Sequence, residues 1–185
     1  MFILNFIFSI VPERISQSTT EAFTAFYNSF LPKVFRYFSY NIADVHQAED
    51  LTSITFEKAL TKFESYSPDK ASPATWIFTI ARNTLFDYFR SSSQRKNVSL
   101  DKITEDPEDQ QTPEQSFLEK EESQILKKCL LKLSSKEQEI ISLKFGADMN
   151  NRQIAAMLSL SDSNVGIILY RAVRKLRVEF AESSK

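Results

Sequence analysis

One stretch constrains the fold more than any other, because it encodes two short helices joined by a tight turn: residues 150–177, NNRQIAAMLSLSDSNVGIILYRAVRKLR. Asn150 and Gln153 have the spacing of a capping box at the start of the first helix. Ser161 is placed to cap the second helix. Apolar residues recur in that second helix at helical spacing: Val165, Leu169, Ala172 or Val173, and Leu176. The pattern favours a helix-turn-helix, which places its second helix in the DNA major groove. The alternative is an ordinary helical hairpin with a solvated basic face.

The remainder of the chain also favours helices. Only two of the 185 residues are glycine. Tight hairpins and phosphate-binding loops depend on glycine, so the composition argues against both. Long segments repeat their apolar residues with a period close to 3.6. Because 42% of the residues are hydrophobic, the chain can bury a core. We therefore expect an all-α protein made of two small helical domains.

The N-terminal half predicts a bundle of three helices. A stripe of aromatic residues predicts the first helix over about residues 20–40. Because Pro32 interrupts this stripe, we expect a kink or break in the helix near 28–31. The second is expected over about residues 45–63. The third is expected to start at Pro73, capped by Ser72, and to run to about residue 90.

The C-terminal half predicts four helices, the last two being the helix-turn-helix. A helix should restart at Pro113 and continue to about residue 133. The next should open with a capping box formed by Ser135 and Gln138, and should end at Gly146.

Charge is distributed unevenly along the chain. Residues 1–92 carry 8 Lys/Arg and 9 Asp/Glu. Residues 93–122 carry 4 Lys/Arg and 9 Asp/Glu, and residues 123–185 carry 11 Lys/Arg and 6 Asp/Glu. Only the last third has the positive excess typical of a nucleic-acid partner. The polar stretch between the helical halves has too few apolar residues to order itself. We expect four parts: an apolar N-terminal extension (1–18), a first domain (19–91), a flexible acidic linker (92–112) and a second domain (113–182).

The composition argues against several classes of function. A single cysteine, Cys129, and a single histidine, His46, make an internal disulfide impossible and a zinc site improbable. They also leave no histidine-based catalytic triad. Cys129 lies on an apolar helical face, which favours a core residue over a reactive thiol. We expect no catalytic site, no metal, no cofactor and no small-molecule substrate.

The first eleven residues, MFILNFIFSIV, are strongly apolar. They are too short to span a bilayer and lack the basic residues that precede a signal peptide. We expect them to pack on the first domain, to be disordered or to reflect an early start codon, without stable membrane insertion. The expected location is cytoplasmic.

Three segments, in order, resemble the motifs of one family: AEDLTSITFEKAL (48–60), TWIFTIARNTLFDYFR (75–90) and LSSKEQEIISLKF (133–145) followed by the helix-turn-helix. Over residues 21–180 the chain resembles the extracytoplasmic-function (ECF) sigma factors, the two-domain specificity subunits of bacterial RNA polymerase. The resemblance implies a transcription initiation factor that binds core RNA polymerase and promoter DNA. It also makes an anti-sigma factor a candidate partner, because many relatives are controlled in that way.

The resemblance assigns polymerase contacts to four residues: Glu49, Asp50, Leu51 and Phe56. They match the positions at which the family contacts the clamp helices of the largest polymerase subunit. Without the resemblance, Leu51 and Phe56 are interpreted as core residues, and the two acidic residues as a solvated first turn.

The same comparison assigns promoter melting to the third helix and the loop before it. Asn83 matches the polar residue that can hydrogen-bond a flipped base, since its amide both donates and accepts. Arg82 and Arg90 match groups that can hold phosphates, and Tyr66 is placed to stack on a base. The alternatives are an exposed helix amide for Asn83 and a loop aromatic that closes over the bundle for Tyr66.

In the helix-turn-helix, five residues are candidate DNA contacts: Arg152, Ser163, Asn164, Arg171 and Arg174. Of these, Arg171 matches a basic position that contacts the upstream element in the family. The family commonly has a basic-polar-basic run after the valine of the second helix, whereas this chain has residues 166–168, Gly-Ile-Ile. We expect altered or weakened recognition of the upstream promoter element. The two isoleucines should either be partly buried or contact thymine methyls.

Two other functions remain open at this point. A helix-turn-helix regulator that does not join polymerase would bind duplex DNA tightly, usually as a dimer on symmetric half-sites. A decoy that docks on polymerase without recognising promoters is also consistent with the Gly-Ile-Ile run.

Overall fold

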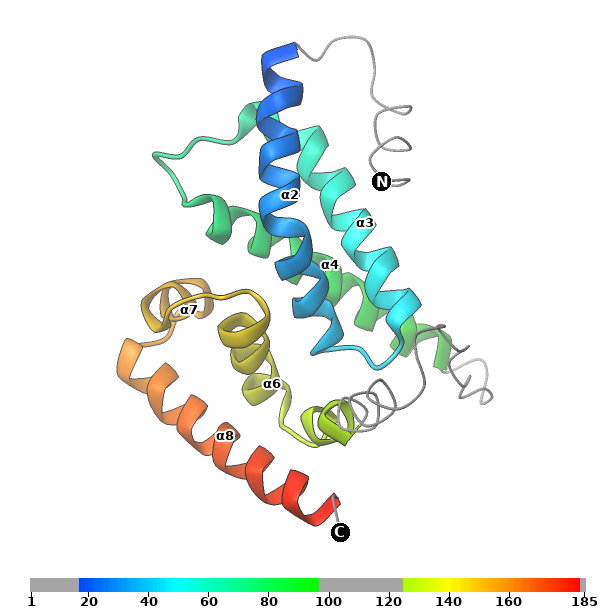
Figure 1. Cartoon of the computed structure of the whole chain (residues 1–185), viewed down its shortest axis with the longest axis vertical. Coiled ribbons are helices and arrows are strands. Elements are labelled where there is room, and N and C mark those ends of the chain that lie inside the picture. Colours follow the sequence, from blue (N-terminus) through cyan, green and yellow to red (C-terminus); the bar gives the residue numbers. More distant parts are fainter. Residues whose placement is uncertain (1–16, 97–124, 184–185) are drawn as a thin grey trace, which may run out of the picture.

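A computed structural model describes residues 17–96 and 125–183, and within those ranges every regular element is a helix. Two helical units lie against each other (Figure 1). The first contains α2 (Gln17–Ser39), α3 (Val45–Lys62), a 3₁₀ turn η1 (Phe63–Ser65) and α4 (Pro73–Lys96). The second contains a helix over 125–131, α6 (Ser135–Ile141), the π-helical turn η2 (Ser142–Gly146), α7 (Asn151–Leu158) and α8 (Asp162–Ser183). The predicted all-α fold is confirmed.

Some predictions concern residues outside the described ranges. These are the N-terminal extension up to residue 16, most of the acidic linker, and residues 113–124 of the helix expected to start at Pro113. The later part of that helix is present over 125–131. Cys129 is buried there, with 1% of its surface exposed, as expected of a core residue.

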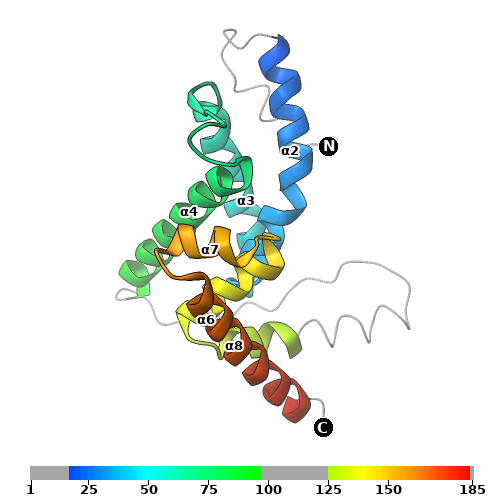
Figure 2. The same cartoon turned by 90° about the vertical axis from the view of Figure 1, so that its left-hand side faces the viewer.

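Pro32 does not break the first helix. α2 is continuous over 23 residues with Pro32 inside it, so of the kink or break predicted near 28–31 the break is absent. The helix instead bends in its second half (Figures 1 and 2). The missing N–H of a proline deprives the carbonyl four residues earlier, at Asn28, of its partner. Pro32 and Asn28 are both exposed, so water can satisfy that carbonyl.

The third helix begins where it was predicted but ends later. The Ser72 hydroxyl accepts a hydrogen bond from the Thr75 N–H at 3.2 Å, which confirms Ser72 as the cap. α4 continues to Lys96, so the boundary predicted at residues 91 and 92 falls inside the helix. Extending an existing helix gains one hydrogen bond for each residue fixed, which lets a polar segment join it.

The cap of α6 is one residue earlier than predicted. Ser134, not Ser135, accepts from the Glu137 N–H, and the Glu137 carboxylate accepts from the Ser134 N–H at 3.0 Å. Either serine suits a cap, but only Ser134 has an acidic residue three positions later. Helical structure does stop at Gly146, yet no glycine has a positive φ; the left-handed residue after the helix is Asp148, with φ 63°.

Gly146 instead lies where the two units meet. A Cβ on Gly146 would stand 2.9 Å from the Cα of Tyr37, so only glycine allows η2 to pack this closely on α2. Gln138 donates to the Tyr40 carbonyl at 2.9 Å, and Lys33 pairs with Asp148 at 3.3 Å. A single buried apolar cluster runs through both units. Figures 1 and 2 both show α6 and α7 lying beside the first bundle.

Candidate nucleic-acid and protein interfaces

The helix-turn-helix forms as predicted. Asn150 and Gln153 make a reciprocal capping box, with both hydrogen bonds at 2.9 Å. The turn is closed by Ser159 in the left-handed conformation, with φ 54°. Ser161 then caps α8 by accepting from the Asn164 N–H at 3.1 Å. The core face of α8 is buried: Val165, Leu169 and Ala172. These contacts fix which face of α8 points away from the protein.

Four of the five predicted DNA-contacting residues lie on that outward face. Ser163, Asn164, Arg171 and Arg174 are all exposed. They lie within about 100° of one another around the helix axis, since an α-helix advances about 100° per residue. Arg152, on α7, is also exposed. The structure therefore brings four of the five predicted residues together on one face of one helix, with the fifth on the helix before it.

The Gly-Ile-Ile run divides between the core and the surface. Ile168 is partly buried and packs against the apolar cluster. Ile167 has 50% of its surface exposed and lies about 100° from Ile168 around the helix axis. Of the two alternatives, partial burial therefore holds for Ile168, whereas Ile167 remains accessible.

Three predicted melting residues lie on α4, in different surroundings. Asn83 is exposed, and none of the described residues hydrogen-bonds to its amide. Arg82 is largely covered: its Nε pairs with Glu139 Oε1 of α6 at 2.5 Å, and its guanidinium lies 4.6 Å from the centre of the Phe86 ring. Arg90 pairs with Asp87 at 2.9 Å. Only Asn83 is thus fully available in this arrangement.

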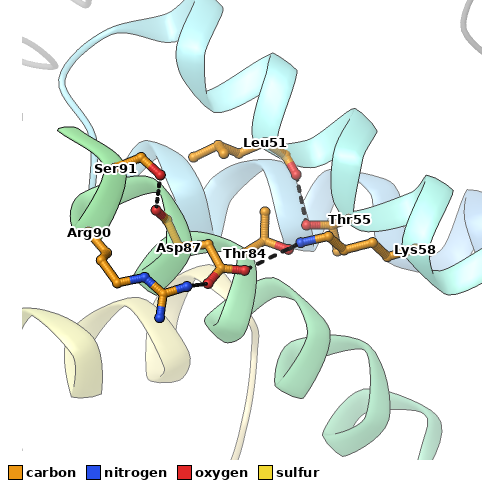
Figure 3. A network of polar contacts seen from close by, with 7 residues as sticks. All are labelled: Leu51, Thr55, Lys58, Thr84, Asp87, Arg90 and Ser91. Carbon is orange, nitrogen blue, oxygen red and sulfur yellow. Dashed lines mark hydrogen bonds and ion pairs between the residues drawn. The ribbon is translucent and has the colours of Figure 1, made fainter. Parts of the chain in front are cut away.

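Asp87 connects α4 to α3 through a polar network (Figure 3). Lys58 donates to the Thr84 hydroxyl at 3.2 Å and lies 3.7 Å from the Asp87 carboxylate, which also holds Arg90. Ser91 donates to the Asp87 carbonyl at 2.8 Å. The network fixes the end of α4 that carries Arg90 against α3.

Tyr66 closes over the bundle, as its alternative interpretation expected. Its ring centre lies 4.8 Å from that of Trp76 and 6.5 Å from that of Phe63. Its hydroxyl donates to the Ala71 carbonyl at 3.0 Å, and desolvation raises its pKa. The ring is therefore held against the bundle and only partly exposed.

Two aromatic residues near Asn83 were missed from the sequence. Phe86 and Phe89 have 47% and 45% of their surfaces exposed. Phe86 is three residues from Asn83 and therefore lies beside it on the helix. Helical spacing could have revealed both rings, because neither phenylalanine falls on the buried face of α4.

The predicted polymerase contacts divide into two exposed and two buried residues. Glu49 and Asp50 are exposed near the start of α3. Leu51 and Phe56 belong to the core, with 5% and 0% of their surfaces exposed, so they support the surface more than they form it. Beside Glu49, residues of α2 and α3 line an apolar groove of about 350 Å³. The groove has eight lining residues: Tyr27, Leu31, Pro32, Phe35, Glu49, Thr52, Ser53 and Phe56.

Neither a metal-binding cluster nor a membrane-spanning helix occurs in the described ranges. No group of three or more His, Cys, Asp or Glu residues gathers as a metal site would require. No helix in those ranges combines the length and apolarity needed to cross a bilayer.

Comparison with known proteins gives a consistent result. Residues 26–95 match the model of Sigma-70 region 2, and residues 123–176 match that of Sigma-70, region 4. The ECF RNA polymerase sigma factor SigL of Mycobacterium tuberculosis is 30% identical over 159 residues, which cover 85% of this chain and 88% of that protein. The ECF RNA polymerase sigma factor BldN of Streptomyces coelicolor is 30% identical over 164 residues, and the match covers 89% of this chain but only 62% of BldN.

The fold is also that of a solved structure. The sigma factor RpoE of Bartonella quintana, in complex with the anti-sigma factor NepR, aligns with a TM-score of 0.67 at 22% identity. The alignment covers 87% of this chain and 98% of the RpoE chain.

Proposed function

The chain belongs to the ECF RNA polymerase sigma factors, and from that premise we propose how its two helical units share promoter-specific transcription initiation. The second unit binds the upstream promoter element, and the first binds core polymerase and captures a promoter base. The observation that carries this division is the exposed polar and basic face of α8, held outward by its buried core face.

The α8 face suits the major groove. Its first turn offers Ser163 and Asn164, short polar side chains that can reach base edges or phosphates, and Arg171 and Arg174 follow within three turns. Arg152 on α7 reaches the phosphate backbone, because the first helix of a helix-turn-helix crosses that backbone.

Base capture falls to Asn83. Unstacking a base costs a few kcal/mol, and an accessible amide can offset that cost by bonding to the base edge. The exposed ring of Phe86 adds stacking surface beside it. Arg82 and Arg90 bind phosphates once they exchange their carboxylate partners for DNA. Tyr66 contributes less stacking surface, because its ring packs on Trp76.

Docking on core polymerase uses the α2–α3 side of the first unit. Glu49 and Asp50 supply exposed negative charge, and the adjoining groove supplies apolar surface for the polymerase clamp. Leu51 and Phe56 hold α3 in place from beneath. The chain then acts in the cytoplasm, with all catalytic chemistry left to the polymerase. An anti-sigma factor is a candidate regulator, as one binds the structurally similar RpoE.

The test is co-purification with bacterial core polymerase, followed by run-off transcription from a promoter selected by the holoenzyme. Asn83→Ala should bind polymerase normally but lose at least about tenfold in transcription, since each 1.4 kcal/mol of lost base contact is tenfold. Asn28→Ala, which removes another exposed amide, from α2, is the control and should transcribe normally.

The other outcomes identify the rival functions. Polymerase binding without any transcription, even by the unaltered chain, would favour the decoy. Tight binding of duplex DNA without polymerase binding would favour a free-standing regulator.

A further inference from the structure

Ile167 lies at the centre of the exposed face of α8. Because an α-helix advances about 100° per residue, the five residues grouped around it lie within about 60° of it around the axis. These are Ser163, Asn164, Tyr170, Arg171 and Arg174, and all are exposed. Ile167 has 50% of its own surface exposed. An apolar side chain therefore occupies the middle of the polar and basic face that we propose contacts DNA.

Folding does not account for the residue pair Gly166–Ile167. The core contacts of α8 come from Val165, Leu169 and Ala172, on the opposite side of the helix. A Cβ on Gly166 would meet only the Asn151 side-chain amide, at 3.8 Å, and its φ is not positive. Glycine weakens a helix interior, and here neither packing nor backbone conformation requires it.

The surroundings of Ile167 suit a polyanion with an apolar group at its surface. Arg171 and Arg174 form no ion pair with any acidic residue in the described ranges. Asp162, the acidic residue of the first turn, lies about 140° away around the axis. In the major groove, thymine presents a methyl group that cytosine lacks, and apolar side chains contact it.

We propose that Ile167 reads the C5 methyl of a thymine in the upstream promoter element, with Gly166 leaving room for the α8 backbone to approach the groove. The inference rests on the proposed function, because it requires α8 to enter that groove. It assigns this chain a preference for an A·T pair at one position.

The experiment uses holoenzyme assembled from the full chain and bacterial core polymerase. The preferred upstream element is first selected from duplexes randomised in that region. Each thymine of the selected element is then replaced in turn by deoxyuridine, which removes the methyl and leaves base pairing intact. At one position this should weaken holoenzyme binding about fourfold, the factor that corresponds to burying one methyl-sized group.

The variants decide whether Ile167 is responsible. Ile167→Ala should bind the thymine and deoxyuridine duplexes equally. Val178→Ala is the matched control, because Val178 is 51% exposed on the same helix but lies eleven residues further along. This control should retain the fourfold preference for thymine.

Two results would overturn the proposal. In the first, the unaltered holoenzyme is indifferent to the methyl at every thymine, or selects an element without thymine. In the second, Ile167→Ala keeps the preference, provided that circular dichroism shows it folded. Holoenzyme that selects no upstream sequence would overturn the proposed function as well, so the two failures are distinguishable.

Discussion

Gly146 lies where the second unit meets the first, and a side chain there has no room. The Cβ of an alanine would stand 2.9 Å from the Tyr37 Cα and 3.0 Å from the Tyr37 backbone nitrogen, and backbone cannot swing aside as a flexible side chain can. Gly146→Ala should therefore lower the free energy of unfolding by about 1–3 kcal/mol, the usual cost of overpacking. Urea unfolding followed by far-ultraviolet circular dichroism measures the change.

Gly166 provides the matched control in the same experiment. A Cβ there meets one atom at ordinary contact distance, so Gly166→Ala should raise the free energy of unfolding by about 0.5–1 kcal/mol through helix propensity. If both substitutions changed stability in the same direction, the packing of η2 on α2 described above would be wrong.

Tyr37 is a buried residue whose hydroxyl has no hydrogen-bond partner in the described part of the chain. Burial raises its pKa above 10, the nearby Glu139 carboxylate raises it further, and Arg82 opposes them. Above about pH 10 the unfolded chain loses the proton of the Tyr37 hydroxyl, whereas the folded state keeps it. The free energy of unfolding is therefore unaffected by this group below about pH 10 and falls as the pH rises further. Tyr37→Phe should reduce this decrease in the free energy of unfolding at alkaline pH.

The same substitution has a consequence at neutral pH. Removing a buried hydroxyl that lacks a partner should leave stability unchanged or raise it by about 1 kcal/mol. Unfolding free energies at pH 7 and pH 10.5 test both statements, with Tyr27→Phe as the comparison because its pKa is also raised by burial. A Tyr37→Phe protein with unaltered pH dependence would contradict the first statement.

At the scale of the element, the start of α6 distinguishes two adjacent serines. Ser134 accepts from the Glu137 N–H, whereas Ser135 is an exposed residue of the first turn. Ser134→Ala should cost about 1 kcal/mol of stability, and Ser135→Ala close to nothing. Thermal unfolding of the two variants tests the assignment, and a larger loss for Ser135→Ala would restore the cap predicted from the sequence.

The helices were predictable because they rest on local signals. The Asn150–Gln153 box, the Ser161 cap and the Ser72–Pro73 start each depend on residues within a few positions of one another. The errors arise where distant residues decide. Gly146 was predicted to end a helix through its conformational freedom. Glycine is instead required there because the backbone of Tyr37, more than one hundred positions earlier, leaves no room for a side chain.

The candidate site was predictable to the same degree. The outward face of α8 follows from helical periodicity, and the contact residues that the resemblance implied on α8 lie on it. Leu51 and Phe56 were assigned a contact role by resemblance, and their burial depends on packing that a motif does not encode. The Arg82–Glu139 pair joins residues 57 positions apart and carried no sequence signal.

At the scale of the whole molecule, the two units form one continuous core, although each matches its own sigma-70 region. The contact is part apolar, through η2 on α2, and part polar, through Gln138 and the Arg82–Glu139 pair. This contact holds Arg82 of α4 against the unit that carries the helix-turn-helix.

This arrangement predicts weak binding of free promoter duplex by the chain alone, because residues 1–92 carry no positive excess and Arg82 is paired. Glu139→Gln removes the partner of Arg82 and should tighten that binding, with a salt dependence steeper by about one phosphate contact. Glu57→Gln changes the net charge equally but lies exposed on α3, away from this pair. Fluorescence anisotropy over a range of salt concentrations compares the variants. Equal effects would mean that net charge, and not the release of Arg82, governs the affinity.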